Sequence, residues 1–233
     1  MISLSPKEMW RERLILPNYQ IGEAAKYANI SSQTVAAWHS KEKKLFSGRE
    51  DGASLSYLQL IEVAVVAAFR RAKIKLPRIR KAREYLKREM KAEYPFAQYK
   101  FKSDGKHLLL EYSQIEGNKA DGRLLVADQE GQLEWDEIIA PLLKEFEYQH
   151  KDIVVRWHVD GVESPITIDP RINFGAPSVR GAPTWVIAGR WNAGESNSEI
   201  AEDFGIGLQD VKKALHFENL SSIKRGKSSR HLH

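Results

Sequence analysis

The first third of the chain places apolar and small residues at helical spacing, with polar residues between them. This pattern predicts one short helix over residues 19–30 and a second over 31–39, joined by a tight turn. Ser31 or Ser32 stands where a side chain can cap the second helix. A helix, a tight turn and a second helix that opens with small polar residues are typical of a helix-turn-helix.

A long apolar segment and a basic amphipathic segment follow. Residues 54–69 predict a capped, mainly apolar helix, and Pro77 opens a further helix with one apolar stripe and a basic back. Residues 70–91 hold eleven Lys or Arg against two Glu. The cations of this helix that could neutralise phosphates or face water are Arg78, Arg80, Lys81, Arg83, Lys87 and Arg88.

Between residues 94 and 160 the periodicity changes from helical to strand-like. Gly-containing turns separate four strands, which are predicted at 99–102, 107–112, 123–127 and 153–159. One helix is predicted over about 135–148, because apolar residues there share one face: Ile138, Ile139, Leu142, Leu143 and Phe146. The segment therefore predicts a small α+β unit.

Residues 161–218 combine a turn-rich start with a second predicted helix-turn-helix. Its helices are expected at 184–192, 198–204 and 208–217. Acidic side chains near the last two helices would repel phosphate, which favours dimerisation of this unit over DNA contact. The unit is also too small to bury all its apolar faces alone. The residues expected to join two chains into a homodimer are Trp185, Trp191, Phe204 and Leu215.

These patterns predict an α+β protein that is mostly α. Its predicted parts are a winged helix-turn-helix at 1–93, a small α+β unit at 94–160, a three-helix domain at 161–218 and a tail at 219–233. Residues 1–93 carry a net charge of +9 and residues 94–218 one of −8, which indicates a polyanionic partner for the first part only. The chain has no cysteine and no apolar stretch long enough to span a bilayer, so we expect a cytoplasmic protein.

The N-terminal helix-turn-helix supplies the candidate DNA-binding residues. The start of its second helix would enter the major groove, where Ser32, Gln33 and Thr34 can meet base edges or phosphates. Trp38 and His39 close the same helix and belong to the predicted interface. The cations that follow, which we expect to contact phosphates, are Lys41, Lys43, Lys44 and Arg49.

The segment from about residue 19 to 90 resembles the winged-helix DNA-binding domain of MerR-type regulators. It carries the helix-turn-helix, a basic segment around Gly48 and Gly52, and the pattern Ser-Tyr-x-x-Leu at residues 56–60. The resemblance implies that the basic segment forms a small β-wing. The chain departs from that family at Trp38 and His39, where an aromatic and then a basic residue are typical, and its wing lacks Gly-Leu-Leu.

Residues of catalytic type occur in the middle segment without a catalytic pattern. His150, Asp152, His158 and Asp160 alternate along the chain, but the acids stand where turns and helix caps need them. The sequence has no nucleophile elbow, phosphate-binding glycine loop or His-Glu-x-x-His helix. We therefore expect no enzyme, no metal site and no cofactor, and a carboxylate-dependent nuclease is the least favoured function.

The most distinctive segment runs from residue 166 to 218. It reads Ile-Thr-Ile-Asp-Pro at 166–170, carries Gly175, Pro177 and Gly181, and continues to Ser-Glu-Ile-Ala at 198–201. This segment closely resembles a small domain of VapB-type antitoxins. The resemblance implies a type II antitoxin that binds a PIN-like, VapC-type ribonuclease toxin and represses its own operon. The alternative is a MerR-like transcriptional regulator whose middle segment binds an effector.

The tail, residues 219–233, is a candidate for the toxin contact. It holds four cations, no acid and no pattern that would fold alone. A PIN-like toxin would present acidic, metal-binding side chains, with which positive charge can pair. The residues expected to bind the toxin are Lys224, Arg225, Lys227 and Arg230.

Overall fold

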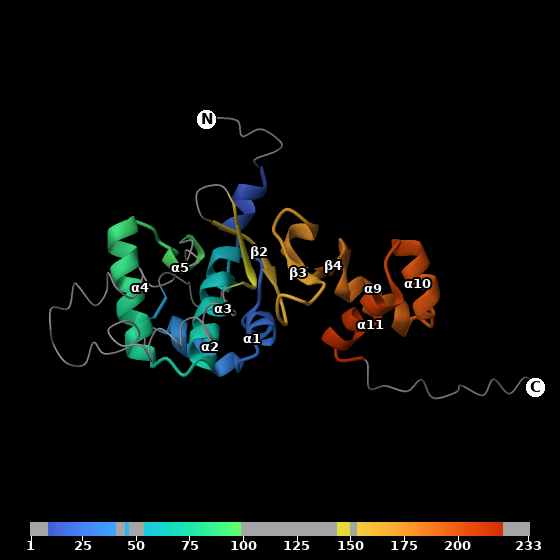
Figure 1. Cartoon of the computed structure of the whole chain (residues 1–233), viewed down its shortest axis with the longest axis horizontal. Helices are drawn as coiled ribbons and strands as arrows, with labels where there is room; N and C mark the ends of the chain where they lie inside the picture. Colours follow the sequence, from blue (N-terminus) through green and yellow to red (C-terminus); the bar gives the residue numbers. More distant parts are fainter. Residues whose placement is uncertain (1–8, 41–44, 47–53, 99–143, 150–152, 221–233) are drawn as a thin grey trace, which may run out of the picture. The chain divides into compact units, whose positions relative to one another are not determined.

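The computed structural model describes residues 9–40, 45–46, 54–98, 144–149 and 153–220 (Figure 1). The chain divides into two compact units, residues 1–163 and 164–233, here called unit 1 and unit 2. The strands predicted at 99–102, 107–112 and 123–127 lie outside the described residues, as does most of the helix predicted at 135–148. The domain limits predicted from the sequence stay predictions.

Helix α3 forms the core of unit 1, where it packs against α1, α4 and α5 (Figure 1). Every residue from Tyr57 to Phe69 is buried. A capping box starts this helix: Ser56 Oγ accepts a hydrogen bond from the Gln59 amide at 3.3 Å, and Gln59 Oε1 accepts one from the Ser56 amide at 2.8 Å. The helices of unit 1 are η1 (Met9–Leu14), α1 (Ile21–Ala28), α2 (Ser32–His39), α3 (Tyr57–Arg71), α4 (Leu76–Met90) and α5 (Pro95–Gln98).

A buried ion pair joins α3, α4 and α5. The Glu62 carboxylate, 1% exposed, accepts hydrogen bonds from Arg83 Nε at 2.5 Å and from the Phe96 amide at 2.6 Å. Arg83 also donates to the carbonyl of Glu93 at 3.0 Å. The prediction that Arg83 lies on a solvent-facing basic back is wrong, because its guanidinium is needed inside to neutralise Glu62.

Strands β1 (Phe146–Gln149) and β2 (Ile153–His158) pair antiparallel in unit 1. Phe146 stacks on Trp157, with ring centroids 5.9 Å apart. The strand predicted at 153–159 is confirmed, whereas the predicted end of the helix at 146–148 is wrong. The alternation of Phe146, Glu147 and Tyr148 suits a strand that pairs with β2, and this pairing overrides the helical spacing of the residues before it.

Unit 2 consists of a short antiparallel sheet followed by three helices. The helices predicted at 184–192 and 208–217 are confirmed. The helix predicted at 198–204 begins one residue earlier, at Asn197. β4 pairs with both β3 and β5. The elements are β3 (Ile166–Ile168), η3 (Asn173–Gly175), β4 (Ser178–Val179), β5 (Ala182–Pro183), α9 (Thr184–Asn192), α10 (Asn197–Phe204) and α11 (Leu208–Phe217).

The core of unit 2 is apolar and draws on the sheet and all three helices. Its buried residues are Val179, Ala182, Ile187, Ile200, Ala201, Val211, Ala214 and Leu215. The fold class predicted from the sequence, α+β with more helix than strand, is confirmed over the described residues. None of the helices in those ranges combines the length and the apolarity needed to cross a membrane.

Candidate nucleic-acid interface

Helices α1 and α2 of unit 1, which cover the first predicted helix-turn-helix, pack against each other. Asn29 ends α1 in the left-handed conformation, at φ 53°, and the next amide, that of Ile30, bonds the Ala25 carbonyl at 3.0 Å. Ser31 then caps α2, where its Oγ accepts from the Thr34 amide at 3.1 Å. The left-handed residue reverses the chain and the serine restarts the helix, as the sequence predicts.

The start of α2 presents polar side chains to solvent. Ser32 and Gln33 are exposed, and Thr34 is half-buried. The Thr34 hydroxyl lies 2.8 Å from Ser31 Oγ, in a hydrogen bond that holds it against the cap. Among these three predicted DNA-binding residues, Gln33 therefore has the longest exposed side chain, with both an acceptor and a donor to offer a base edge.

The end of α2 packs inward. Trp38 is 5% exposed and meets Phe46 edge to face, with ring centroids 6.0 Å apart. His39 is half-buried: its Nδ1 lies 2.9 Å from the Val35 carbonyl oxygen, and its ring lies 5.0 Å from that of Phe46. The Trp38 ring is therefore part of the packed interior. If α2 contacts DNA, the contact must come from the first turn of that helix.

The basic segment after α2 is anchored at its middle. The amides of Leu45 and Phe46 both reach the Trp38 carbonyl, at 3.1 and 3.2 Å, and both side chains are buried. The Arg83 guanidinium lies 5.5 Å from the centroid of the Phe46 ring. The predicted phosphate contacts flank this anchor but lie outside the described residues: Lys41, Lys43, Lys44 and Arg49.

The residues predicted for dimerisation differ in exposure. Trp185 on α9 is 64% exposed, whereas Leu215 on α11 is 4% exposed and belongs to the core of its own chain. Trp191 and Phe204 are partly buried against the same core. Unit 2 therefore covers Leu215 within its own chain, and Trp185 is the most exposed of the four residues predicted for dimerisation. The tail cations Lys224, Arg225, Lys227 and Arg230 lie outside the described residues.

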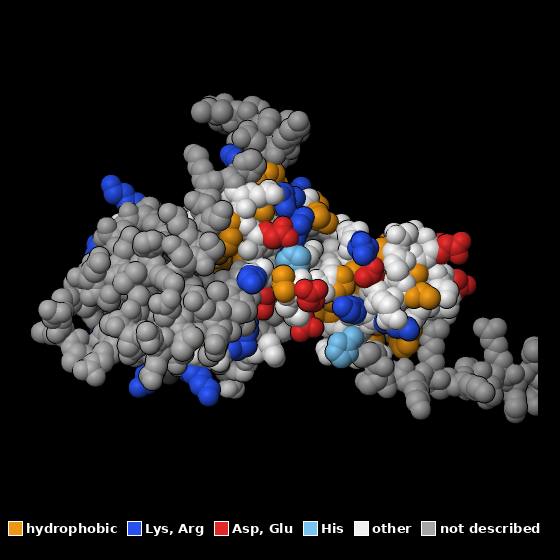
Figure 2. Space-filling model, in the orientation of Figure 1, with side chains coloured by type: hydrophobic (Ala, Val, Ile, Leu, Met, Phe, Trp, Pro, Cys, Tyr) orange, Lys and Arg blue, Asp and Glu red, His pale blue; other side chains and the backbone are white. Residues whose placement is uncertain are grey.

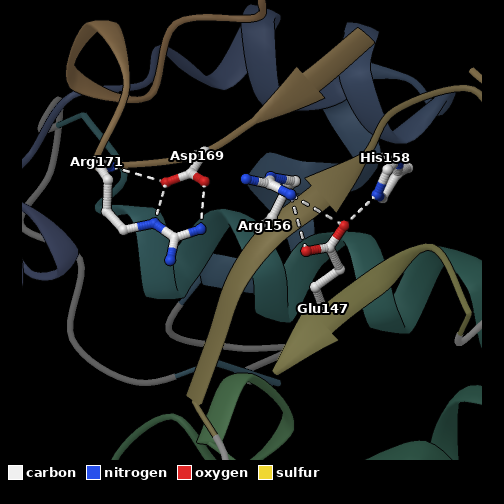
Figure 3. Close-up of polar contacts among 5 residues, drawn as sticks. All are labelled: Glu147, Arg156, His158, Asp169 and Arg171. Carbon is white, nitrogen blue, oxygen red and sulfur yellow. Dashed lines mark hydrogen bonds and ion pairs between the residues drawn. The ribbon is translucent and has the colours of Figure 1, made fainter. Parts of the chain in front are cut away.

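Polar clusters that sequence reasoning missed lie at the ends of strands (Figure 3). In unit 1, Glu147 accepts hydrogen bonds from Arg156 at 3.0 Å and is bonded to His158 Nε2 at 2.6 Å. Partial burial favours a higher pKa for Glu147, but its bonds to His158 and Arg156 outweigh it and hold that pKa below the ordinary value. In unit 2, Arg171 binds the buried Asp169 through two side-chain bonds, at 2.8 and 2.6 Å.

These clusters are ion pairs rather than metal sites. No group of three or more His, Asp or Glu side chains converges within the part of the chain that the structure describes. The cross-strand pair Glu147 and Arg156 comes from the β1–β2 register, which is set by pairing in space. The sequence did not indicate this pairing, because the spacing of apolar residues before β1 predicted a helix there.

The chain is similar to a known family, to a named relative and to a solved structure. Residues 166–217 match the family described as a protein of unknown function, DUF433. The chain is 23% identical over 227 residues to a Mycobacterium tuberculosis protein named "Putative antitoxin VapB45", and the match covers 87% of this chain and 94% of that relative. The crystal structure of Rv2018 from Mycobacterium tuberculosis shares the fold, with a TM-score of 0.68 and 21% identity over 87% of this chain and 99% of that one.

Proposed function

We propose that this chain is the antitoxin of a toxin–antitoxin pair, which binds its toxin directly and represses its own operon by binding DNA. The observation that carries the proposal is the similarity, over nearly the whole length of both chains, to a protein whose name is that of an antitoxin. The match of residues 166–217 to a family without an assigned function leaves room for this role.

The DNA-binding part of the proposal rests on α1 and α2. A capped second helix that presents Ser32, Gln33 and part of Thr34 suits insertion of its first turn into the major groove. The basic charge of residues 1–93 suits a phosphate backbone. In this proposal, the segment of Lys41, Lys43, Lys44 and Arg49 is a MerR-like wing that contacts phosphates.

The toxin-binding part rests on charge. A PIN-like ribonuclease holds divalent metal with acidic side chains, so an inhibitor that enters its site gains from positive charge. The tail from residue 221 onward carries four cations and no acid. Ordering about ten residues costs on the order of 10 kcal/mol, so the folded units must supply a second toxin contact. Homodimerisation through unit 2, with Trp185 at the interface, stays part of the proposal.

Gel-shift titration with the DNA upstream of the chain's own gene tests repression. Gln33→Ala is expected to cost roughly 1–3 kcal/mol at one base pair and to relax sequence preference there. The matched control is Gln149→Ala, because Gln149 is an exposed glutamine at the end of β1. Equal effects of the two variants would contradict the proposal that α2 contacts DNA.

Co-expression tests the antitoxin role. The full chain should restore growth of cells that express the product of the adjacent reading frame, and deletion of residues 221–233 should lower that protection while leaving DNA binding intact. Growth arrest that the full chain does not relieve would contradict the antitoxin proposal. Full protection by the shortened chain would place toxin binding in the folded units.

A further inference from the structure

Helices α10 and α11 of unit 2 repeat the backbone course of α1 and α2 in unit 1. In each copy an eight-residue helix ends at a left-handed residue, Asn29 at φ 53° or Gly205 at φ 62°. An isoleucine follows, and then an extended residue, Ser31 or Gly207, that stands at the cap of the second helix. The two turns therefore have the same length and the same order of conformations.

The hydrogen bonds of the two turns also correspond. The amide of Asn29 bonds the Lys26 carbonyl at 3.2 Å, and that of Gly205 bonds the Glu202 carbonyl at 3.1 Å. The next amides, of Ile30 and Ile206, each reach an alanine carbonyl at 3.0 Å. Each first helix opens with a glutamate whose carboxylate accepts from the cap amide at 2.7 Å. Both turns are thus built by the same local bonds.

The side chains at equivalent places agree in identity and in burial. Val35 and Val211, on the inner faces of the second helices, are both 0% exposed. Gln33 and Gln209, the second residues of those helices, are both exposed. The identical pairs are Glu23 and Glu199, Ala25 and Ala201, Ile30 and Ile206, Gln33 and Gln209, and Val35 and Val211. A fold that only needed two packed helices would not require the exposed glutamine at the same position.

The outer face of α11 is polar and carries positive charge. Gln209, Lys212, Lys213 and His216 are all exposed, and Leu208 is 47% exposed at the start of the helix. At the positions of the two lysines, α2 has alanines. A glutamine can read an adenine edge, lysines can bind phosphates or guanine, and an apolar side chain can contact a thymine methyl group.

The acids around α11 are largely engaged within unit 2. Arg190 on α9 pairs with Glu195 and Asp203, and Asp210 pairs with Arg180 at 2.7 Å. Glu199 closes the cap of α10. On the face of unit 2 visible in Figure 2, basic, acidic and hydrophobic side chains are accordingly interspersed. This pairing weakens the repulsion of phosphate that the acidic sequence of this segment predicts.

We propose that α11 is a second DNA-reading helix, so that one chain recognises two separate segments of duplex DNA, one through α2 and one through α11. This inference rests on the proposed DNA-binding function and revises the sequence-based preference for dimerisation over DNA contact. Gln209 reads a base edge, and Lys212 and Lys213 bind phosphates or guanines. Arg180, on the turn between β4 and β5, neutralises Asp210 in the first turn of this helix.

Selection of binding sites from a randomised duplex DNA pool, with the full chain, tests the inference. The wild type should select two blocks of preferred sequence. Gln209→Ala should relax one block with about tenfold weaker binding, Gln33→Ala should relax the other, and Gln149→Ala should relax neither. Lys212→Gln with Lys213→Gln should lower the slope of log affinity against log salt by up to about 2, whereas Lys144→Gln should leave it unchanged.

The outcomes separate the inference from the function on which it rests. Two symmetric blocks that both depend on Gln33, with no effect of Gln209→Ala, would mean a dimer that reads DNA through α2 alone and would overturn the inference. A change from dimer to monomer in the lysine variant, with both blocks intact, would make α11 a protein interface and would also overturn it. A wild type that selects no sequence would refute the proposed DNA binding together with this inference.

Discussion

The helix pairs α1–α2 and α10–α11 share a backbone course but pack against different neighbouring elements. In unit 1, α1 packs against both α2 and α3, and the buried residues of α3 include the charged Glu62. In unit 2, α10 and α11 rest on α9 and two short strands, around a cluster of apolar side chains. Unit 2 also buries a carboxylate, that of Asp169, but its cation is Arg171, two residues later in the chain, so this pair joins no two helices.

This difference shows what a buried charge can contribute. Burial raises the pKa of Glu62, although its contacts with Arg83 and the amides of Phe96 and Ala97 act in the opposite direction. A buried ion pair is a weak source of stability, but each of its bonds fixes an orientation. Through Glu62 and Arg83, α3 is held against both α4 and α5, whereas the three helices of unit 2 meet around an apolar cluster.

Removing one member of the buried pair should have the largest effect. Arg83→Met leaves Glu62 buried without a cation and should lower the free energy of unfolding of unit 1 by about 3–5 kcal/mol. Lys87→Met is the matched control, because Lys87 pairs with Glu93 at 2.7 Å on the surface, where both side chains are more than a third exposed. That control should cost less than about 1 kcal/mol.

Urea unfolding followed by tryptophan fluorescence measures both variants. Partial relief by the double variant Glu62→Leu with Arg83→Met would show that the unpaired charge causes the loss. Equal stability of Arg83→Met and Lys87→Met would mean that the buried pair does not hold the helices of unit 1 together.

A cavity in the apolar core of unit 2 tests how much that core stabilises the three helices around it. Ile200 is 0% exposed, and Ile200→Ala should lower the stability of unit 2 by about 3 kcal/mol. Leu208→Ala is the control, because Leu208 is 47% exposed. Hydrogen exchange by residue should show the loss in α9, α10 and α11. An equal increase in the exchange rate of α3 would contradict the expectation that the core of unit 2 is independent of unit 1.

The sequence predicted what local signals control and failed where partners in space decide. The helix limits of unit 2 follow from spacing that acts within a few residues, and one of the two serines predicted to cap α2, Ser31, is its cap. Arg83 was predicted to face solvent because its partner, Glu62, lies twenty-one residues earlier, and no local pattern links the two. Trp38 looked like an interface residue because its packing partner, Phe46, lies in a basic segment.

The caps of α2 and α11, the second helices of the two pairs, should change the free energy of unfolding by a smaller amount. Ser31 caps α2 with its side chain, whereas Gly207 at the same place in unit 2 has none. Ser31→Ala should cost about 1 kcal/mol, and Gly207→Ser should gain a few tenths. A Cβ at Gly207 would lie 3.4 Å from Asp210 Oδ2, an ordinary contact, so the serine fits. Urea midpoints for both variants measure the difference, and a loss on Gly207→Ser would contradict the equivalence of the turns.

The smallest effect concerns an ion pair of unit 1 in which the side chain of Glu147 is partly exposed. Because its bonds to His158 and Arg156 lower the pKa of Glu147 in the folded protein, its ionised form stabilises the fold above the ordinary value of 4.5. That contribution is lost as the pH falls through the lowered pKa. Glu147→Gln should therefore cost at most about 1 kcal/mol at pH 7, since the carboxylate is partly screened by solvent. Urea unfolding of both proteins across this pH range should show the difference shrink toward zero in acid, and a difference that grows on acidification would reverse the sign of the argument.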